Sequence, residues 1–254
     1  MIQNAFIRIV DARNNQEMCR YNLSENYDNM TAMIFGEVYR NNGEWKFNAI
    51  GSGYLASPEQ AETVCRVFDL LRGEDTLIVV DPAMADHGRL YKPFAPDFPR
   101  HMKKVCARAD VLLPNLTEAC LLTDTPYREE PDEPFVRELL KKLSALAPRV
   151  VLTGVSFTPE KLGAMSYDRN TGRYFSYFNE RIPASFHGTG DIFTATVLGG
   201  MMQGRALEKA VALAVDFVLE CIRCTRADPE ASWYGVEFEK ALPWLAEQTA
   251  GRST

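Results

Sequence analysis

Residues His187-Gly188-Thr189-Gly190-Asp191 have the composition of a site that binds a phosphate and activates a hydroxyl. The two glycines precede an apolar helical pattern, so unpaired backbone N–H groups are expected to point outward from the helix start. The helix dipole adds partial positive charge there, and glycine lets a phosphate approach the backbone closely. A carboxylate at the mouth of this cradle suits a base that activates a hydroxyl for attack on a phosphoryl group. The structural alternative is that Asp191 caps the helix and the glycines form a turn.

Further polar residues follow three short apolar runs, and the carboxyl ends of parallel strands face the ligand crevice of an α/β sheet. Asp81-Pro82-Ala83-Met84-Ala85-Asp86 offers two carboxylates that could hold Mg²⁺ directly or through water, or else forms a turn. In Pro114-Asn115-Leu116-Thr117-Glu118, Asn115 and Glu118 either face the same crevice or form a capping box. Thr153-Gly154-Val155 suits a nucleotide, or only a loop. Together with the glycine-opened helix, these strand ends favour Mg²⁺-dependent phosphoryl transfer over four unrelated turns.

The segments between these motifs alternate between short apolar strands and amphipathic helices. We expect strands at 76–80, 111–113 and 150–152, and helices at 57–73, 98–109, 117–122, 134–146, 190–203, 206–225 and 236–247. A hairpin is expected around Asn170-Thr171-Gly172. This alternation predicts an α/β fold with a parallel sheet covered by helices on both faces.

The first fifty residues differ from the rest because they predict only strands. Alternating or β-rich runs occupy 5–11, 17–23, 31–38 and 44–50, and Asn41-Asn42-Gly43 between the last two is a hairpin signal. We therefore predict a β-rich segment at 1–50 and an α/β region at 51–254.

Composition excludes several classes of protein. The 28 basic and 34 acidic residues give a net charge of −6, which argues against a protein that coats nucleic acid. No run of about 18 apolar residues predicts a membrane span, and the N-terminus does not have the pattern of a signal peptide. A cytoplasmic location is expected, with the six cysteines reduced and the pair Cys221 and Cys224 packed in the core.

From about residue 51 to 245 the sequence resembles the pyridoxal/pyridoxamine kinases of the ribokinase superfamily. The stretches that carry the resemblance occur in the family's order: SGYLASPEQ (52–60), VVDPAMADHGRLY (79–91), ADVLLPNLTEA (109–119), VVLTGVSF (150–157) and ERIPASFHGTGDIFTATVLGG (180–200). The resemblance implies a ribokinase-like sheet that lacks the family's first strand. It also implies transfer of the γ-phosphate of ATP, with Mg²⁺, to the 5′-hydroxymethyl group of a B6 vitamer (pyridoxal, pyridoxamine or pyridoxine).

The resemblance also implies roles for individual residues. Asp191 would be the catalytic base, and the amides of Gly188, Thr189 and Gly190 would form the anion hole. The residues implied to bind the nucleotide are Asp81, Asn115, Glu118, Thr153, Gly154 and Val155. Asp86 and Glu118 would hold Mg²⁺, and Tyr54 and Asp191 would contact the vitamer. Family members are commonly dimers, so a homodimer is implied as well.

Residues 4–51 instead resemble the C-terminal strands of the TerD-type tellurium-resistance stress proteins. The stretches AFIRIVDARNNQE, RYNLSENY and TAMIFGEVYRNNGEWKFNAIGSGY carry this likeness. The chain therefore resembles a hybrid, in which missing kinase strands expose a sheet edge unless the N-terminal hairpin covers it. Two other functions remain open beside a B6 kinase. One is a catalytically impaired nucleotide-binding relic or TerD-like interaction protein, and the other is a sibling kinase that acts on a hydroxymethylpyrimidine or a sugar.

Overall fold

The structure is a computed structural model of the 254-residue chain. The residues that it describes are 6–11, 16–22, 37–41, 44–52, 55, 57–73, 76–184, 186–231 and 235–249. The chain divides into two compact units, Met1–Met33 and Ile34–Thr254. In the first unit, β1 (Phe6–Asp11) and β2 (Gln16–Asn22) form an antiparallel hairpin.

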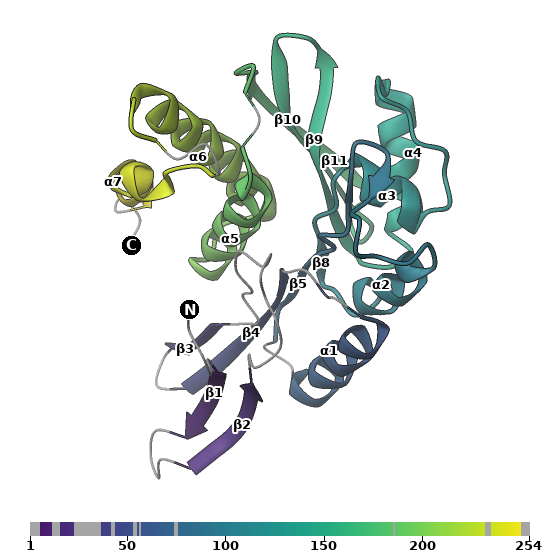
Figure 1. Ribbon diagram of the computed structural model, residues 1–254, viewed down its shortest axis with the longest axis vertical. Coiled ribbons are helices and arrows are strands. Elements are labelled where there is room, and N and C mark those ends of the chain that lie inside the picture. Colours follow the sequence, from purple (N-terminus) through teal and green to yellow (C-terminus); the bar gives the residue numbers. More distant parts are fainter. Residues whose placement is uncertain are drawn as a thin grey trace. The chain divides into compact units, whose positions relative to one another are not determined.

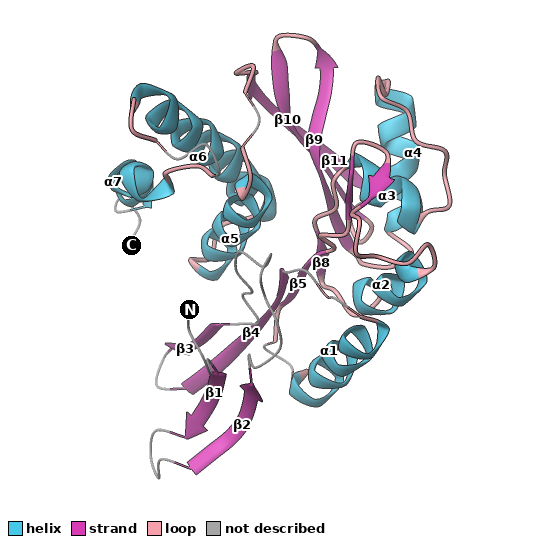
Figure 2. Ribbon diagram, in the orientation of Figure 1, coloured by secondary structure: helices cyan, strands magenta, loops and turns pink. Residues whose placement is uncertain are grey.

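A seven-stranded sheet forms the centre of the second unit, in the order β11-β10-β9-β8-β5-β4-β3 (Figures 1 and 2). Its strands are β3 (Glu37–Asn41), β4 (Glu44–Ser52), β5 (Ile78–Asp81), β8 (Val111–Leu112), β9 (Arg149–Thr158), β10 (Lys161–Asp168) and β11 (Arg173–Glu180). The four strands β4, β5, β8 and β9 are mutually parallel, and an antiparallel strand or hairpin extends the sheet at each edge. A separate small hairpin joins β6 (Ala85–Asp86) to β7 (Arg89–Leu90).

Helices cover both faces of this sheet, as Figure 1 shows. They are α1 (Pro58–Leu71), α2 (Phe98–Cys106), α3 (Leu116–Leu122), α4 (Glu133–Leu143), α5 (Thr189–Met202), α6 (Leu207–Ala227) and α7 (Phe238–Thr249). Ile78 and Val80 of β5 pack with the first four helices, whereas Val79 packs with α5 and α6. The alternation along β5 therefore confirms the predicted sheet buried on both faces. None of the helices among the described residues is long and apolar enough to cross a membrane.

Local sequence signals explain most element boundaries. The predicted cap of α1 is confirmed, because Oγ of Ser57 accepts a hydrogen bond of 3.3 Å from the backbone N–H of Gln60. The predicted helices 98–109 and 134–146 end earlier than expected, at Cys106 and Leu143. After the cap residues, the N–H groups of Arg108, Ala109, Ala145 and Leu146 bond three residues back, in tighter turns that close the helix.

Two predictions about the strands after residue 150 have opposite outcomes. The hairpin around Gly172 is confirmed, and the φ angle of Gly172 is +70°. The alternative that 153–155 forms only a loop is wrong, because β9 continues to Thr158. The antiparallel partner β10 satisfies the backbone of this extension, with a register shift where Gly163 faces Val155.

The β3–β4 hairpin extends the sheet beyond the kinase-like segment. Its residues up to Ile50 lie in the TerD-like stretch, yet β4 pairs in parallel with β5, with Ser52 opposite Asp81. The first part of the predicted strand 31–38 lies outside the described residues. The compact units divide at Met33, and the predicted domain boundary near residue 50 stays a prediction.

The cysteine pair of α6 packs as the sequence predicts. Cys221 is buried in a small apolar cluster with Phe217 and Ala241, and Cys224 packs against it. Both are free thiols, and no group of three or more potential metal ligands forms among the residues that the structure describes.

Candidate active site

The end of β5 and the start of α5 lie next to each other. Asp81, the last residue of β5, is only 9% exposed. Its Oδ2 accepts a hydrogen bond of 3.0 Å from Oγ1 of Thr194 on α5. A Cβ atom placed on Gly190 would lie 3.8 Å from the same oxygen. The predicted convergence of a strand end and the glycine-opened helix is therefore present at this point.

The first turn of α5 has the form of an anion cradle. Gly188 is the N-cap, in a left-handed conformation (φ +84°) that glycine adopts without strain, and it provides no side-chain capping bond. Oγ1 of Thr189 donates to the carbonyl oxygen of Phe186 at 3.5 Å. Asp191 lies in the first turn and is exposed, so it is not the capping residue of the structural alternative. The turn thus presents backbone N–H groups beside an accessible carboxylate.

The first turn of α3 shows the predicted capping box. Oδ1 of Asn115 accepts from the N–H of Glu118 at 3.0 Å, and Oε2 of Glu118 accepts from the N–H of Asn115 at 2.9 Å. Glu118 is only 2% exposed. Its other oxygen, Oε1, accepts from the N–H groups of Met84 (3.0 Å) and Ala85 (3.4 Å). The capping box that the sequence offered as the structural role of Asn115 and Glu118 is therefore present.

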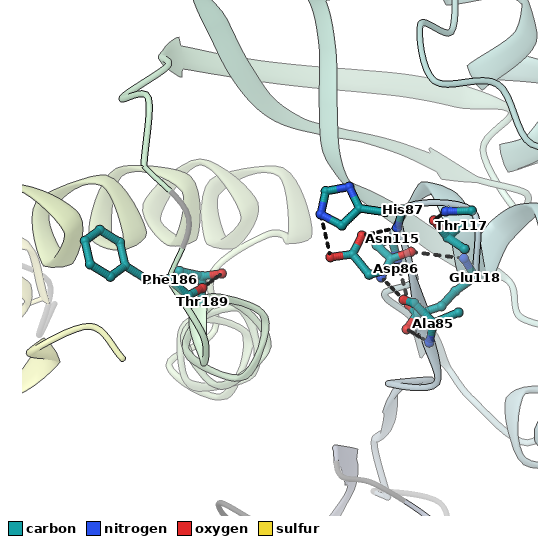
Figure 3. Close-up of polar contacts among 9 residues, drawn as sticks. Ala85, Asp86, His87, Asn115, Thr117, Glu118, Phe186 and Thr189 are labelled. Carbon is teal, nitrogen blue, oxygen red and sulfur yellow. Dashed lines mark hydrogen bonds and ion pairs between the residues drawn. The ribbon is translucent and has the colours of Figure 1, made fainter. Parts of the chain in front are cut away.

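The same turn of α3 also holds the β6–β7 hairpin in place (Figure 3). Nδ2 of Asn115 donates to the carbonyl oxygen of Ala85 at 2.8 Å. Oγ1 of Thr117 accepts from the N–H of Gly88 at 2.9 Å. With the bonds to Glu118, three side chains of one helical turn fix the backbone of 84–88, which follows Asp81. The sequence analysis did not single out the hydroxyls of Thr117 and Thr194, which make two of these contacts.

The hairpin itself has a two-residue type I′ turn. His87 (φ +49°) and Gly88 (φ +75°) are both left-handed, and Asp86 pairs with Arg89 across the turn. Asp86 is exposed. Its Oδ1 accepts from the N–H of His87 at 2.8 Å, and its Oδ2 lies 3.6 Å from Nε2 of His87. Asp86 is thus at the tip of a hairpin that α3 anchors.

Replacement of Gly88 by alanine tests how closely the turn of this hairpin packs against the ring of Tyr127. A Cβ atom at Gly88 would lie 2.8 Å from the ring of Tyr127, whereas one at Gly172, also left-handed (φ +70°), would meet nothing within 4 Å. We expect Gly172→Ala to cost about 1 kcal/mol of unfolding free energy and Gly88→Ala about 2–4 kcal/mol, because overpacking adds to backbone strain. Urea unfolding of both variants measures the difference. Equal losses would contradict the contact with Tyr127.

The carboxylates of these elements share one environment. Burial raises the pKa of Tyr91, and the charges of Glu118, Asp86, Asp81 and Asp191 all raise it further. Burial raises the pKa of Asp81 to about 7, against the hydrogen bond from Thr194, and the charge of Asp191 adds to the rise. Burial, followed by the charge of Asp81, raises the pKa of Glu118, although three backbone N–H bonds oppose this. Negative charge is therefore concentrated at this edge of the sheet.

The grouping of carboxylates at this edge of the sheet predicts that the stability of the protein without ligands depends on pH. The folded state holds the proton of Asp81 more tightly than the unfolded chain does, so stability falls as pH rises from about 4 to about 7. The charge of Asp191 adds to the rise in the pKa of Asp81, and the pKa of Glu118, raised by burial and then by the charge of Asp81, makes stability fall with pH in the same direction. We expect Asp81→Asn to weaken this pH dependence and to raise the melting temperature at pH 8. Thermal unfolding in EDTA between pH 5 and pH 8 tests this. A melting temperature of Asp81→Asn below that of the wild type at pH 8 would contradict it.

The remaining predicted site residues lie in three different settings. Thr153 forms a parallel bridge with Asn115, and its N–H donates to the carbonyl oxygen of Pro114 at 3.0 Å. Gly154 is exposed and left-handed (φ +67°), whereas the side chain of Val155 is buried in the core. Only the backbone of Val155 can therefore border a ligand. Tyr54 lies outside the described residues.

The donor chemistry of the site fits Mg²⁺ bound together with a nucleotide. Mg²⁺ in such sites is held by one or two carboxylates, several waters and substrate phosphates. No lysine or arginine of the described residues pairs with the buried carboxylates of Asp81 and Glu118. Their charge is thus left for a cation to balance.

Comparison with known proteins divides the chain into two parts. Residues 1–58 match the TerD domain. General stress protein 16U of Bacillus subtilis is 58% identical over 53 residues, which cover 21% of this chain and 28% of that protein. The pyridoxal kinase of Arabidopsis thaliana is 33% identical over 192 residues, which cover 72% of this chain and 60% of that enzyme. The chain thus spans less than two thirds of either curated relative.

A solved structure covers the second part more fully. A putative phosphomethylpyrimidine kinase of Bacteroides thetaiotaomicron, crystallised with pyridoxal, superposes with a TM-score of 0.73 at 30% identity, covering 83% of each chain. The sheet and the helices on both of its faces therefore have a ribokinase-like fold. Within that class of fold, the chain is similar to pyridoxal kinases over 60% of the length of the Arabidopsis thaliana enzyme. Both predicted resemblances, to pyridoxal kinases and to TerD at the N-terminus, are confirmed.

Proposed function

We propose that this protein phosphorylates the 5′-hydroxymethyl group of a B6 vitamer with ATP, and so serves the salvage of pyridoxal 5′-phosphate. The observation that carries the proposal is the contact of Asp81, at the end of β5, with the N-terminal part of α5, where Thr194 bonds to it and Gly190 approaches it. The charge of Asp191, in the first turn of the same helix, acts on Asp81. The similarity to pyridoxal kinases supports the choice of substrate. The solved relative with bound pyridoxal supports it too.

Each part of the site has a role in this reaction. Asp191 accepts the proton of the vitamer hydroxyl as that oxygen attacks the γ-phosphorus, while the bond from this phosphorus to the β,γ-bridging oxygen breaks and ADP leaves. The N–H groups of Gly188, Thr189 and Gly190 stabilise the charge that develops on the transferred phosphoryl group. Glycine at 188 leaves open space next to these amides, so a phosphate can approach the backbone. Tyr54 is proposed to border the vitamer.

The nucleotide is proposed to lie along the carboxyl ends of the strands. Asp81, Asn115 and Glu118 would border its phosphates, and Thr153, Gly154 and Val155 would border the rest of the nucleotide. Asp86 and Glu118 would hold Mg²⁺, with Glu118 acting through water because its oxygens already accept three backbone N–H bonds. When bound, Mg²⁺ would neutralise charge on the ATP phosphates. A homodimer is proposed because the kinases that this sequence resembles are commonly dimers.

Turnover with a panel of acceptors tests this proposal. The full chain is incubated with ATP, Mg²⁺ and one acceptor at a time, and ADP formation is followed. The acceptors are pyridoxal, pyridoxamine, pyridoxine, a hydroxymethylpyrimidine and ribose, with a reaction lacking acceptor as the blank. We expect ADP formation only with one or more of the B6 vitamers. Turnover confined to the pyrimidine or the sugar would replace the substrate class, and a folded protein that binds ATP without any turnover would be a nucleotide-binding relic.

A further inference from the structure

Thr194 makes a polar contact inside an otherwise apolar interface between α5 and β5. It lies three residues after Asp191 and is 1% exposed. Its hydroxyl donates to Oδ2 of Asp81, which is 113 residues away in the sequence. Val79 of the same strand and Phe193 and Val197 of the same helix are buried members of one apolar cluster. A hydroxyl and a carboxylate are costly to bury in such an interface unless they bond to each other, so the pair fixes how the helix meets the strand.

This bond has two consequences for the site. It turns Oδ2 of Asp81 toward α5, and among the described residues no hydrogen bond reaches Oδ1, which leaves that oxygen for a ligand. It also fixes α5 against the strand end one turn after residues 188–191, which belong to the same helix. The base and anion cradle on α5 therefore keep a constant position relative to the carboxylate on β5.

We propose that Thr194 is a positioning residue, whose hydroxyl aligns Asp81 with the first turn of α5 for phosphoryl transfer. This inference rests on the proposed function and deepens it. A misplacement of about 1 Å at such a site can cost about 10²-fold in rate, even when the residue that moves does not touch the reacting atoms. Thr194 touches no reacting atom and acts only through Asp81 and the helix.

The same helix offers a matched control. Thr196, two residues further on, is also buried, at 7% exposed. Its hydroxyl donates to the carbonyl oxygen of Ile192 within the helix, at 2.7 Å. Valine at either position removes one buried hydroxyl and keeps the shape of the side chain. Only the change at Thr194 removes a contact with the site.

The experiment compares Thr194→Val, Thr194→Ser and Thr196→Val in the full chain. For each variant we measure kcat, the KM for the vitamer, and the Kd for Mg²⁺ with the non-hydrolysable analogue AMP-PNP. We expect Thr194→Val to lower kcat by about 10–100-fold and to weaken nucleotide binding by about tenfold, with the vitamer KM within about threefold. Thr194→Ser, which keeps the hydroxyl, and Thr196→Val are expected to stay within about threefold of the wild type.

Several outcomes would overturn the inference. If Thr194→Val and Thr196→Val behave alike, or if Thr194→Ser is as impaired as Thr194→Val, the hydroxyl has no positioning role. Should Thr194→Val not fold, the smaller variant Thr194→Ala takes its place in the comparison. A wild-type protein that binds AMP-PNP without turnover refutes the proposed function alone, and the Kd values then decide the role of Thr194. A folded wild type that does not bind the nucleotide overturns both.

Discussion

Asp191→Asn is expected to abolish vitamer-dependent turnover while the protein still folds and binds nucleotide. Asparagine keeps the size of the side chain but cannot accept the proton of the attacking hydroxyl, and loss of a general base typically costs about 10²–10⁴-fold in kcat. Asp191 is exposed in the first turn of α5, so little packing is lost. Its negative charge also opposes ionisation of Asp81, and the substitution removes that effect. We therefore expect the affinity for Mg²⁺ with AMP-PNP to stay within about threefold or to improve.

A matched substitution separates this catalytic effect from a general effect of charge. Glu208 is also an acidic residue in the first turn of a helix, α6, which begins beyond the far end of α5. Glu208→Gln should keep kcat within about threefold of the wild type. Single-turnover kinetics with each vitamer give the comparison. A variant with asparagine at 191 that retains most of its kcat would exclude Asp191 as the base and leave the amides of 188–190 as the main source of catalysis.

The elements of this fold could be predicted from the sequence because their signals are local. Ser57 caps its helix by accepting a hydrogen bond from the N–H of Gln60, only three residues later. The strand that ends at Asp81 is an unbroken apolar run up to that residue. The long-range partners could not be predicted in this way. Nothing near Thr194 in the sequence points to Asp81, and nothing near β4 shows that it would join the sheet in parallel with β5. Such pairings depend on which apolar faces bury each other, and several registers satisfy the same pattern.

The candidate site shows the same division between local and distant information. The spacing of Asn115 and Glu118 predicts a capping box, and that box is present. The second oxygen of Glu118 bonds to the backbone of Met84 and Ala85, some thirty residues earlier, and this contact has no signature in either segment. The sequence therefore predicts which residues gather at the sheet edge. It does not distinguish a carboxylate that faces a ligand from one that holds the backbone.

Glu118→Gln is expected to destabilise the folded protein, and this follows from the hydrogen bonds that the side chain accepts. Glu118 is 2% exposed and accepts three backbone N–H bonds with its two oxygens. Glutamine has one acceptor oxygen, and its NH₂ group would face an N–H donor on the other side. Each hydrogen bond to a charged group contributes about 1.5–3 kcal/mol, so at least this much stability is lost. For a domain of this size the melting temperature should fall by about 4–10 °C.

Two measurements separate this structural role from a role only in binding Mg²⁺. Glu138→Gln, an exposed change on α4 that removes an ion pair with Lys142, should alter stability by less than about 1 kcal/mol. Melting temperatures in EDTA report the backbone bonds without any metal, and a titration with Mg²⁺ and AMP-PNP reports binding. If Glu118→Gln melts like the wild type in EDTA and loses only its response to Mg²⁺, Glu118 is a metal ligand whose hydrogen bonds to β6 contribute little. A large loss of stability in EDTA would instead mean that α3 holds the β6–β7 hairpin through this carboxylate, and that Asp86 depends on Glu118 for its position at the site.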